Sequence, residues 1–188
     1  MIYNSIISLV LKDLTETFLY VPKAALFGFI VIVLLMTLKS LSFYLKKWSF
    51  MSNYQIVAAG TFISYIYIVL MISYFSRPAG SRNEVNLVLL ETWRNSAQSR
   101  AYVVENIIMM IPFGLLLPAF FKPSGNFFCC IPLGFMFSVC LEYSQFLSKR
   151  GYMQTDDVVM NVIGTAIGYL VFLLLNFTIR SLQKNTCI

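Results

Sequence analysis

Five apolar stretches, each about as long as a lipid bilayer is thick, occupy most of this 188-residue sequence. They lie near 21–43, 54–76, 103–121, 126–147 and 157–179. A helix needs about 20 mostly apolar residues to cross the hydrocarbon, and inside it the backbone must satisfy its own hydrogen bonds. The expected fold is therefore all-α: an integral membrane bundle of about five transmembrane helices, with an N-terminal amphipathic helix.

Composition supports a membrane protein over a soluble one. Hydrophobic residues make up 59% of the chain and charged residues 12%, whereas charged residues are about 25% of a typical soluble domain. Residues 21–188 show no domain boundary, low-complexity tract or internal repeat, so they are interpreted as one helical membrane domain. The lack of a visible repeat argues against a transporter built from duplicated halves.

Residues 1–20 have the pattern of an amphipathic helix. Apolar side chains recur at helical spacing on one face, at Tyr3, Ile6, Ile7, Val10, Leu14 and Phe18. This pattern favours a helix that lies in the membrane interface, and the alternative is an amphipathic start with no role. Lys12, Asp13 and Glu16 interrupt any apolar centre, which argues against a cleavable signal peptide.

A second apolar stripe lies in the segment that links the second and third spans. It consists of Val85, Val88, Leu89, Thr92 and Trp93. Residues so spaced form one face of a helix, and we expect this stripe to dip into the interface.

The cysteine and histidine content excludes several kinds of chemistry. Three cysteines lie inside the fourth span and the last at the tail, a spacing that fits neither a zinc site nor a disulfide framework. There is no histidine, so any proton transfer by this chain falls to carboxylates, lysine or tyrosine. Apolar packing is the favoured role of the cysteines, ahead of redox chemistry or lipid attachment. The sequence identifies no metal site and no cofactor.

Charge is distributed unevenly between the two membrane surfaces that the five spans define. All eight acidic residues fall on the surface that holds the N-terminus, while basic residues fall on both. A purely basic surface suits the anionic inner leaflet, so we expect the C-terminus to be cytoplasmic and the N-terminus outside. The count of basic residues alone barely selects an orientation.

Polar side chains on three predicted helices fall at one depth near the surface that holds the N-terminus. Asp157 and Asn161 share a face of the fifth span with Gly164 and Gly168, Glu142 and Gln145 lie on the fourth, and Asn106 begins the third, ahead of Pro112 and Gly114. A carboxylate that faces hydrocarbon costs about 2.5 to 3.5 kcal/mol, so these groups are expected to face one another or a wet cavity. The two glycines allow another helix to approach closely.

Each of these residues also has a purely structural alternative. Asp156 can stabilise the start of the fifth helix, because acids oppose the helix dipole there. Glu142 can pair with Arg150 or Lys149 near the interface. Asn106 and Asn161 can hydrogen-bond to each other across helices.

Three segments together resemble the VanZ-like membrane proteins, named after the accessory teicoplanin-resistance protein. The segments are "ENIIMMIPFGLLLP", "LEYSQF" and "RGYMQTDDVVMNVIGTAIGY", within a resemblance that runs from about 86 to 169. Two departures stand out: "NLVLLETW" keeps only Asn86 and Leu87 of an element found in many members, and Gln154 replaces a frequent acid. The resemblance implies a multi-pass protein of the bacterial cytoplasmic membrane, in some members linked to glycopeptide tolerance, without an agreed mechanism.

Three functions fit these observations. The favoured one is binding or handling of an envelope lipid, glycan or glycopeptide-type ligand by a patch made of Asn106, Glu142, Gln145, Arg150, Asp156, Asp157 and Asn161. In it, Arg150, Arg77 or Arg82 holds a phosphate or carboxylate. The second is docking of another membrane protein on the small-residue face. The third is an enzyme whose carboxylates hold a divalent cation and act on a lipid-linked substrate. The expected surroundings are a lipid bilayer, and no nucleic acid is expected to bind.

Overall fold

Among the residues that the computed structural model describes, five helices are long and apolar enough to cross a membrane, which confirms the predicted all-α membrane bundle. They are Ser5–Tyr44, Asn53–Phe75, Ala97–Phe120, Phe127–Leu147 and Thr155–Gln183. The structure describes residues 2–45, 51–78, 80, 85–89, 91–94, 96–151 and 153–186. The protein is thus a multi-pass membrane protein.

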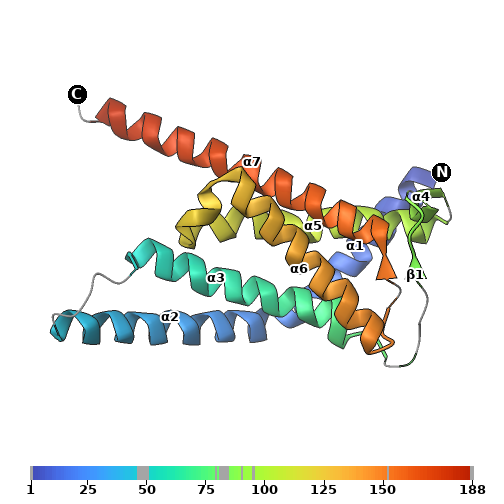
Figure 1. Ribbon diagram of the computed structural model, residues 1–188, viewed down its shortest axis with the longest axis horizontal. Coiled ribbons are helices and arrows are strands. Elements are labelled where there is room, and N and C mark those ends of the chain that lie inside the picture. Colours follow the sequence, from blue (N-terminus) through green and yellow to red (C-terminus); the bar gives the residue numbers. More distant parts are fainter. Residues whose placement is uncertain are drawn as a thin grey trace.

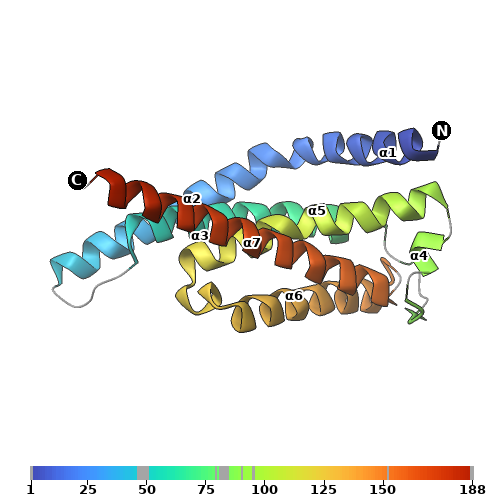
Figure 2. The ribbon, with the colours of Figure 1, turned by 90° about the horizontal axis from the view of Figure 1, so that it is seen from above.

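The first span is a composite of three helical segments. The helix α1 (Ile2–Thr17) leads through the 3-10 turn η1 (Phe18–Tyr20) into α2 (Val21–Tyr44), which has Pro22 in its first turn. Proline is tolerated there because the first amides of a helix have no intrahelical partner. α1 lies alongside α5 (Ala97–Phe120), as Figure 2 shows, and its Val10 is buried. The amphipathic segment therefore contributes one wall of the bundle.

α2 packs against the next helix, α3 (Asn53–Leu70), through glycines. A Cβ atom on Gly28 would overlap the backbone of Gly60, and one on Gly60 would overlap Ile32. The absence of side chains at both positions lets the two backbones approach closely. A capping box opens α3, in which Gln55 N–H donates to Ser52 Oγ at 3.2 Å and Ser52 N–H donates to Gln55 Oε1 at 3.0 Å. α3 continues into the π-helical turn η2 (Met71–Phe75).

The remaining spans are α5, α6 (Phe127–Leu147) and α7 (Thr155–Thr186), and the 3-10 turn η3 (Lys122–Gly125) connects α5 to α6. The chain continues as a helix through Pro112. Near it, the Tyr65 hydroxyl donates to the Met109 carbonyl at 2.9 Å, which ties α3 to the turn where proline removes a donor. The buried core cluster consists of Met110, Phe113, Leu117, Cys130 and Tyr169.

Small residues bring α5 and α7 into close contact. A Cβ atom on Gly164 would overlap the carbonyl oxygen of Ile107, and one on Gly168 would overlap that of Ile111. Gly114 lies in the same way against the backbone of Thr165. The small-residue face of α7 is thus covered by α5 of the same chain and does not lie free for another protein.

The segment between α3 and α5 is fastened to the start of α7. Its two-residue strand β1 (Val85–Asn86) pairs in parallel with β2 (Met153–Gln154), and the short helix α4 (Glu91–Arg94) follows. The stripe expected over Val85 to Trp93 does not form one helix, because strand pairing takes its first residue. Thr92 is buried, while Val85, Val88, Leu89 and Trp93 are exposed.

The two termini lie at opposite ends of the elongated bundle (Figure 1). The N-terminal end also holds β1, α4 and the connection from α6 to α7. The polar residues predicted on three helices all belong to this end.

Candidate functional site

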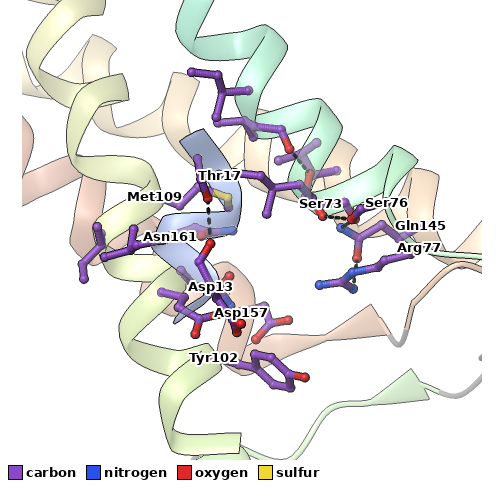
Figure 3. A pocket seen from close by; sticks show the side chains of 18 of the residues that line it. Asp13, Thr17, Ser73, Ser76, Arg77, Tyr102, Met109, Gln145, Asp157 and Asn161 are labelled. Atoms are coloured by element: carbon purple, nitrogen blue, oxygen red, sulfur yellow. Dashed lines mark hydrogen bonds between the residues drawn. The ribbon is translucent and has the colours of Figure 1, made fainter. Parts of the chain in front are cut away.

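A cavity of about 1170 Å³ lies among α1, α3, α5, α6 and α7 at the N-terminal end of the bundle (Figure 3). Seven of the residues singled out in the sequence line it: Asn106, Pro112, Glu142, Gln145, Arg150, Asp157 and Asn161. Asp156 and the helix-packing glycines Gly114, Gly164 and Gly168 are not among the lining residues. Side chains that are far apart in the sequence thus share one cavity.

Asn161 is the most deeply buried polar side chain in the lining. It is 2% exposed, and its Nδ2 donates to Ser138 Oγ of α6 at 2.8 Å. Its Oδ1 is buried and has no hydrogen-bond partner within the described residues. The Asn106–Asn161 pair that the sequence allowed is therefore replaced by a bond between α7 and α6.

Asp157 lies one helical turn before Asn161 and borders the same cavity. The Asn106 amide of α5 lies beside the Asp157 carboxylate. Asp157 Oδ1 is buried and, among the residues the structure describes, has no hydrogen-bond partner. A buried acceptor left without a donor costs about 1 to 3 kcal/mol, so this end of α7 has unmet hydrogen-bonding capacity.

Two buried α6 side chains tie the cavity wall together. Glu142 is 4% exposed, and its Oε2 accepts from the Gln154 N–H at 3.3 Å. Gln145 is 3% exposed; its Nε2 donates to the Ser73 carbonyl at 3.0 Å and its Oε1 accepts from Arg77 Nη1 at 3.2 Å. Gln145 therefore joins α6 to the end of the second span.

Arg150 is held by the backbone of the segment that follows α3. Its Nη1 donates to the carbonyls of Arg77 at 2.7 Å and Tyr74 at 3.3 Å. Its guanidinium carbon lies 5.0 Å from the centre of the Tyr74 ring, within the range of a cation–π contact. Through these contacts Arg150 holds the turn after α3, whose residues Ser76 and Arg77 line the cavity.

The two adjacent aspartates at the start of α7 have different surroundings. Asp156 is 2% exposed, and its Oδ2 accepts from the backbone N–H of the buried Thr92 at 2.9 Å. It thereby fastens α4 to α7, while Asp157 borders the cavity. Both aspartates lie in the first turn of α7, where acids oppose the helix dipole.

Sequence reasoning did not assign three acidic residues that line the cavity, Asp13, Glu16 and Glu105. Asp13 comes from α1 and Glu105 from α5, and their side chains lie within hydrogen-bonding range of each other. Glu105 Oε1 is a third buried acceptor with no partner in the part of the chain that is described. The available signals were the position of Glu105 next to Asn106 and the charge of Asp13 within an apolar helix.

One arginine sits among the carboxylates of the cavity. Arg77 interacts electrostatically with Glu105, Glu142 and Asp157. Figure 3 shows Arg77 and Gln145 on one side of the cavity and Asp13, Asp157 and Tyr102 on the other. The cavity thus has several acceptors, two arginines, Arg77 and Arg150, and apolar walls. Within the described ranges, no three His, Cys, Asp or Glu side chains lie close enough to hold a metal ion.

Comparison with protein families gives a match that covers most of the spans. The family model described as VanZ/LLP1 matches residues 61–176. That range includes each residue singled out for the patch, and it leaves out α1 with Asp13. Neither the curated proteins nor the solved structures gave a match to the chain.

Proposed function

The chain belongs to the VanZ/LLP1 family, and we propose that it binds an amphiphile of the bacterial envelope in the cavity among α1, α3, α5, α6 and α7. The polar head of the amphiphile occupies the end lined by α5, α6 and α7. Its apolar part lies along the wall made by α3 and η1. The protein acts as a binding device that holds or presents this molecule at the membrane surface.

One observation carries this proposal: three buried acceptors around a single cavity have no donor among the described residues. They are Glu105 Oε1, Asp157 Oδ1 and Asn161 Oδ1. Buried polar groups in folded proteins almost always have a hydrogen-bond partner. A ligand with hydroxyl, amide or amine donors would supply the missing bonds.

The rest of the lining supports a ligand with an apolar part. Leu19, Tyr65, Ile68, Ile72 and Met109 line the cavity together with the polar residues. Ligand sites commonly combine mostly apolar walls with a few placed polar groups. A free sugar or ion would leave the apolar walls without a partner, whereas an amphiphile uses both surfaces.

Family membership and charge pattern set the biological context of the proposal. The protein resides in the bacterial cytoplasmic membrane with its N-terminus outside, so that the cavity opens at the outer leaflet. A molecule held there would include an envelope lipid or a glycopeptide of the teicoplanin type. Tolerance of such glycopeptides is then the expected phenotype of the intact chain.

Native mass spectrometry of the full chain, released from detergent, tests this function. We expect a retained mass of one amphiphile on the native protein. Ile72→Trp should abolish that mass, because the indole fills the cavity that Ile72 lines. Ile163→Trp is the matched control, since Ile163 lies on α7, is 40% exposed and does not line the cavity.

A retained mass that survives Ile72→Trp as well as Ile163→Trp would place the molecule elsewhere and overturn the proposal. Size-exclusion chromatography checks that both variants remain folded. If Ile72→Trp unfolds the protein, Asp157→Asn provides the second test, because it removes the charge of one unpaired acceptor and keeps the side-chain shape. Unchanged retention in Asp157→Asn would then count against the site.

A further inference from the structure

Charge in the cavity lining is strongly biased toward acids. The acidic lining residues are Asp13, Glu16, Glu105, Glu142 and Asp157, and the basic ones are Arg77 and Arg150. Arg150 donates to two backbone carbonyls, and Arg77 donates to Gln145. The lining therefore has more acidic than basic side chains, five against two.

Part of this excess of acidic side chains lies where α1 contacts α5, at Asp13 and Glu105. The two carboxyl groups lie within hydrogen-bonding range of each other and interact electrostatically. Two ionised carboxylates at this separation would repel each other, most strongly where water is scarce. A positive group placed beside the pair would remove that repulsion.

Asn161 provides an independent sign of a ligand. Its side chain is 2% exposed, it lines the cavity, and its Oδ1 has no hydrogen-bond partner in the described part of the chain. Glu105 Oε1 and Asp157 Oδ1 are also buried acceptors without a partner there. An amide oxygen and the oxygens of ionised carboxylates accept hydrogen bonds, so the groups that would pair with them are donors.

We propose that the head of the bound amphiphile is an amine in its ammonium form, placed between the Asp13–Glu105 pair and the face of α7 that carries Asp157 and Asn161. An ammonium group combines a positive charge with three N–H donors and has no acceptor. It thus fits both the acidic excess of the lining and the unpaired oxygens, whereas an ionised phosphate or carboxylate head has no N–H donor for those oxygens and faces five acidic side chains against two arginines. This inference rests on the proposed function and specifies the chemical class of its ligand.

A comparison of three synthetic amphiphiles with the same chain length tests the head group. The full chain in phosphatidylcholine nanodiscs would be titrated with dodecylamine, dodecanol and dodecyl phosphate, and binding would be followed by intrinsic tryptophan and tyrosine fluorescence. We expect dodecylamine to bind at least tenfold more tightly than dodecanol and dodecyl phosphate to bind most weakly. Dodecyltrimethylammonium, which keeps the charge but lacks N–H donors, should bind more weakly than dodecylamine.

Two substitutions test whether Glu105 is responsible for the preference for dodecylamine over dodecanol. Glu105→Gln should remove most of the advantage of dodecylamine over dodecanol. Glu91→Gln is the matched control, because it makes the same change on α4, outside the cavity lining, and should keep the full preference. Equal preference in both variants would overturn the placement of the amine.

The two proposals fail in different ways. Dodecanol or dodecyl phosphate binding as tightly as dodecylamine, at a site that Ile72→Trp blocks, would overturn the ammonium head and leave amphiphile binding intact. Absence of Ile72-sensitive binding for all of these probes, together with no retained native amphiphile, would overturn both.

Discussion

The Asn161 side chain donates from Nδ2 to Ser138 Oγ at 2.8 Å, and this bond fixes its unpaired Oδ1 at the cavity. Because an amide has one donor end and one acceptor end, pairing the donor with Ser138 determines which end remains for a ligand. The contact between α6 and α7 thus decides the polarity of this part of the site. We therefore infer that a ligand at this point carries a hydrogen-bond donor.

Asp157→Asn tests the link between the cavity and the biological phenotype. The change removes one negative charge at an unpaired acceptor and keeps the shape of the side chain. We expect the variant to lose the proposed glycopeptide tolerance, measured as the minimal inhibitory concentration of teicoplanin for a susceptible bacterium that expresses it. Immunoblotting of membranes should show unchanged protein level, and full tolerance at that level would contradict the role of Asp157.

Gly168→Ala tests the close contact between α5 and α7. The added methyl group would overlap the carbonyl oxygen of Ile111, and overpacking of this kind typically costs about 1 to 3 kcal/mol. We expect a lower midpoint of thermal unfolding in detergent. Gly125→Ala adds the same group where nothing lies within 4 Å, so its midpoint should stay near that of the native protein. Equal midpoints in the two variants would show that the helices are not packed this closely.

Arg150→Ala tests whether this arginine holds the turn after α3. The variant loses bonds to the carbonyls of Tyr74 and Arg77 and the contact with the Tyr74 ring. Bonds from a charged donor are worth about 1.5 to 3 kcal/mol, so we expect a clear loss of thermal stability. Lys149→Ala removes a neighbouring exposed charge and should change stability little. A stable Arg150→Ala protein would favour a role in ligand binding alone.

Asp156→Ala tests the attachment of α4 to α7. Without the carboxylate, the Thr92 N–H loses its acceptor, and we expect its hydrogen exchange to accelerate by roughly tenfold or more, as loss of a charged hydrogen bond implies. Asp156→Asn keeps an oxygen at the same place and should retain most of the protection. Hydrogen–deuterium exchange over 85–94, read by mass spectrometry, distinguishes the variants. Equal exchange in Asp156→Ala and the native protein would show that Asp156 does not fasten α4.

The bundle was predictable from sequence because crossing a bilayer imposes a length on each apolar run. The third and fourth predicted spans, 103–121 and 126–147, correspond to α5 and α6, although α5 begins earlier, at Ala97. Its first turns are polar and follow a cap at Ser96, whose Oγ accepts from the Ser99 N–H. The length of an apolar run in the sequence does not reveal the polar helical residues that continue the helix beyond that run.

The cavity required tertiary information that spacing does not contain. Asp156 and Asp157 are adjacent on α7, and helical geometry points their side chains in different directions. Only the packing of α4 shows that Asp156 is the one that binds α4, through the Thr92 N–H. Asp13 could not be identified as a cavity residue from the sequence, because Glu105, the residue it contacts, lies far along the chain. The glycines of α7 showed that a helix approaches closely, and the structure identifies that helix as α5.

An experimental structure of the full chain in lipid nanodiscs, purified from its own membrane, tests the central claim most directly. We predict density for one amphiphile in the cavity, with donor atoms of its head within hydrogen-bonding distance of Asn161 Oδ1 and Asp157 Oδ1. A cavity without such a molecule, in which donors of the protein itself occupy these two oxygens, would contradict the account.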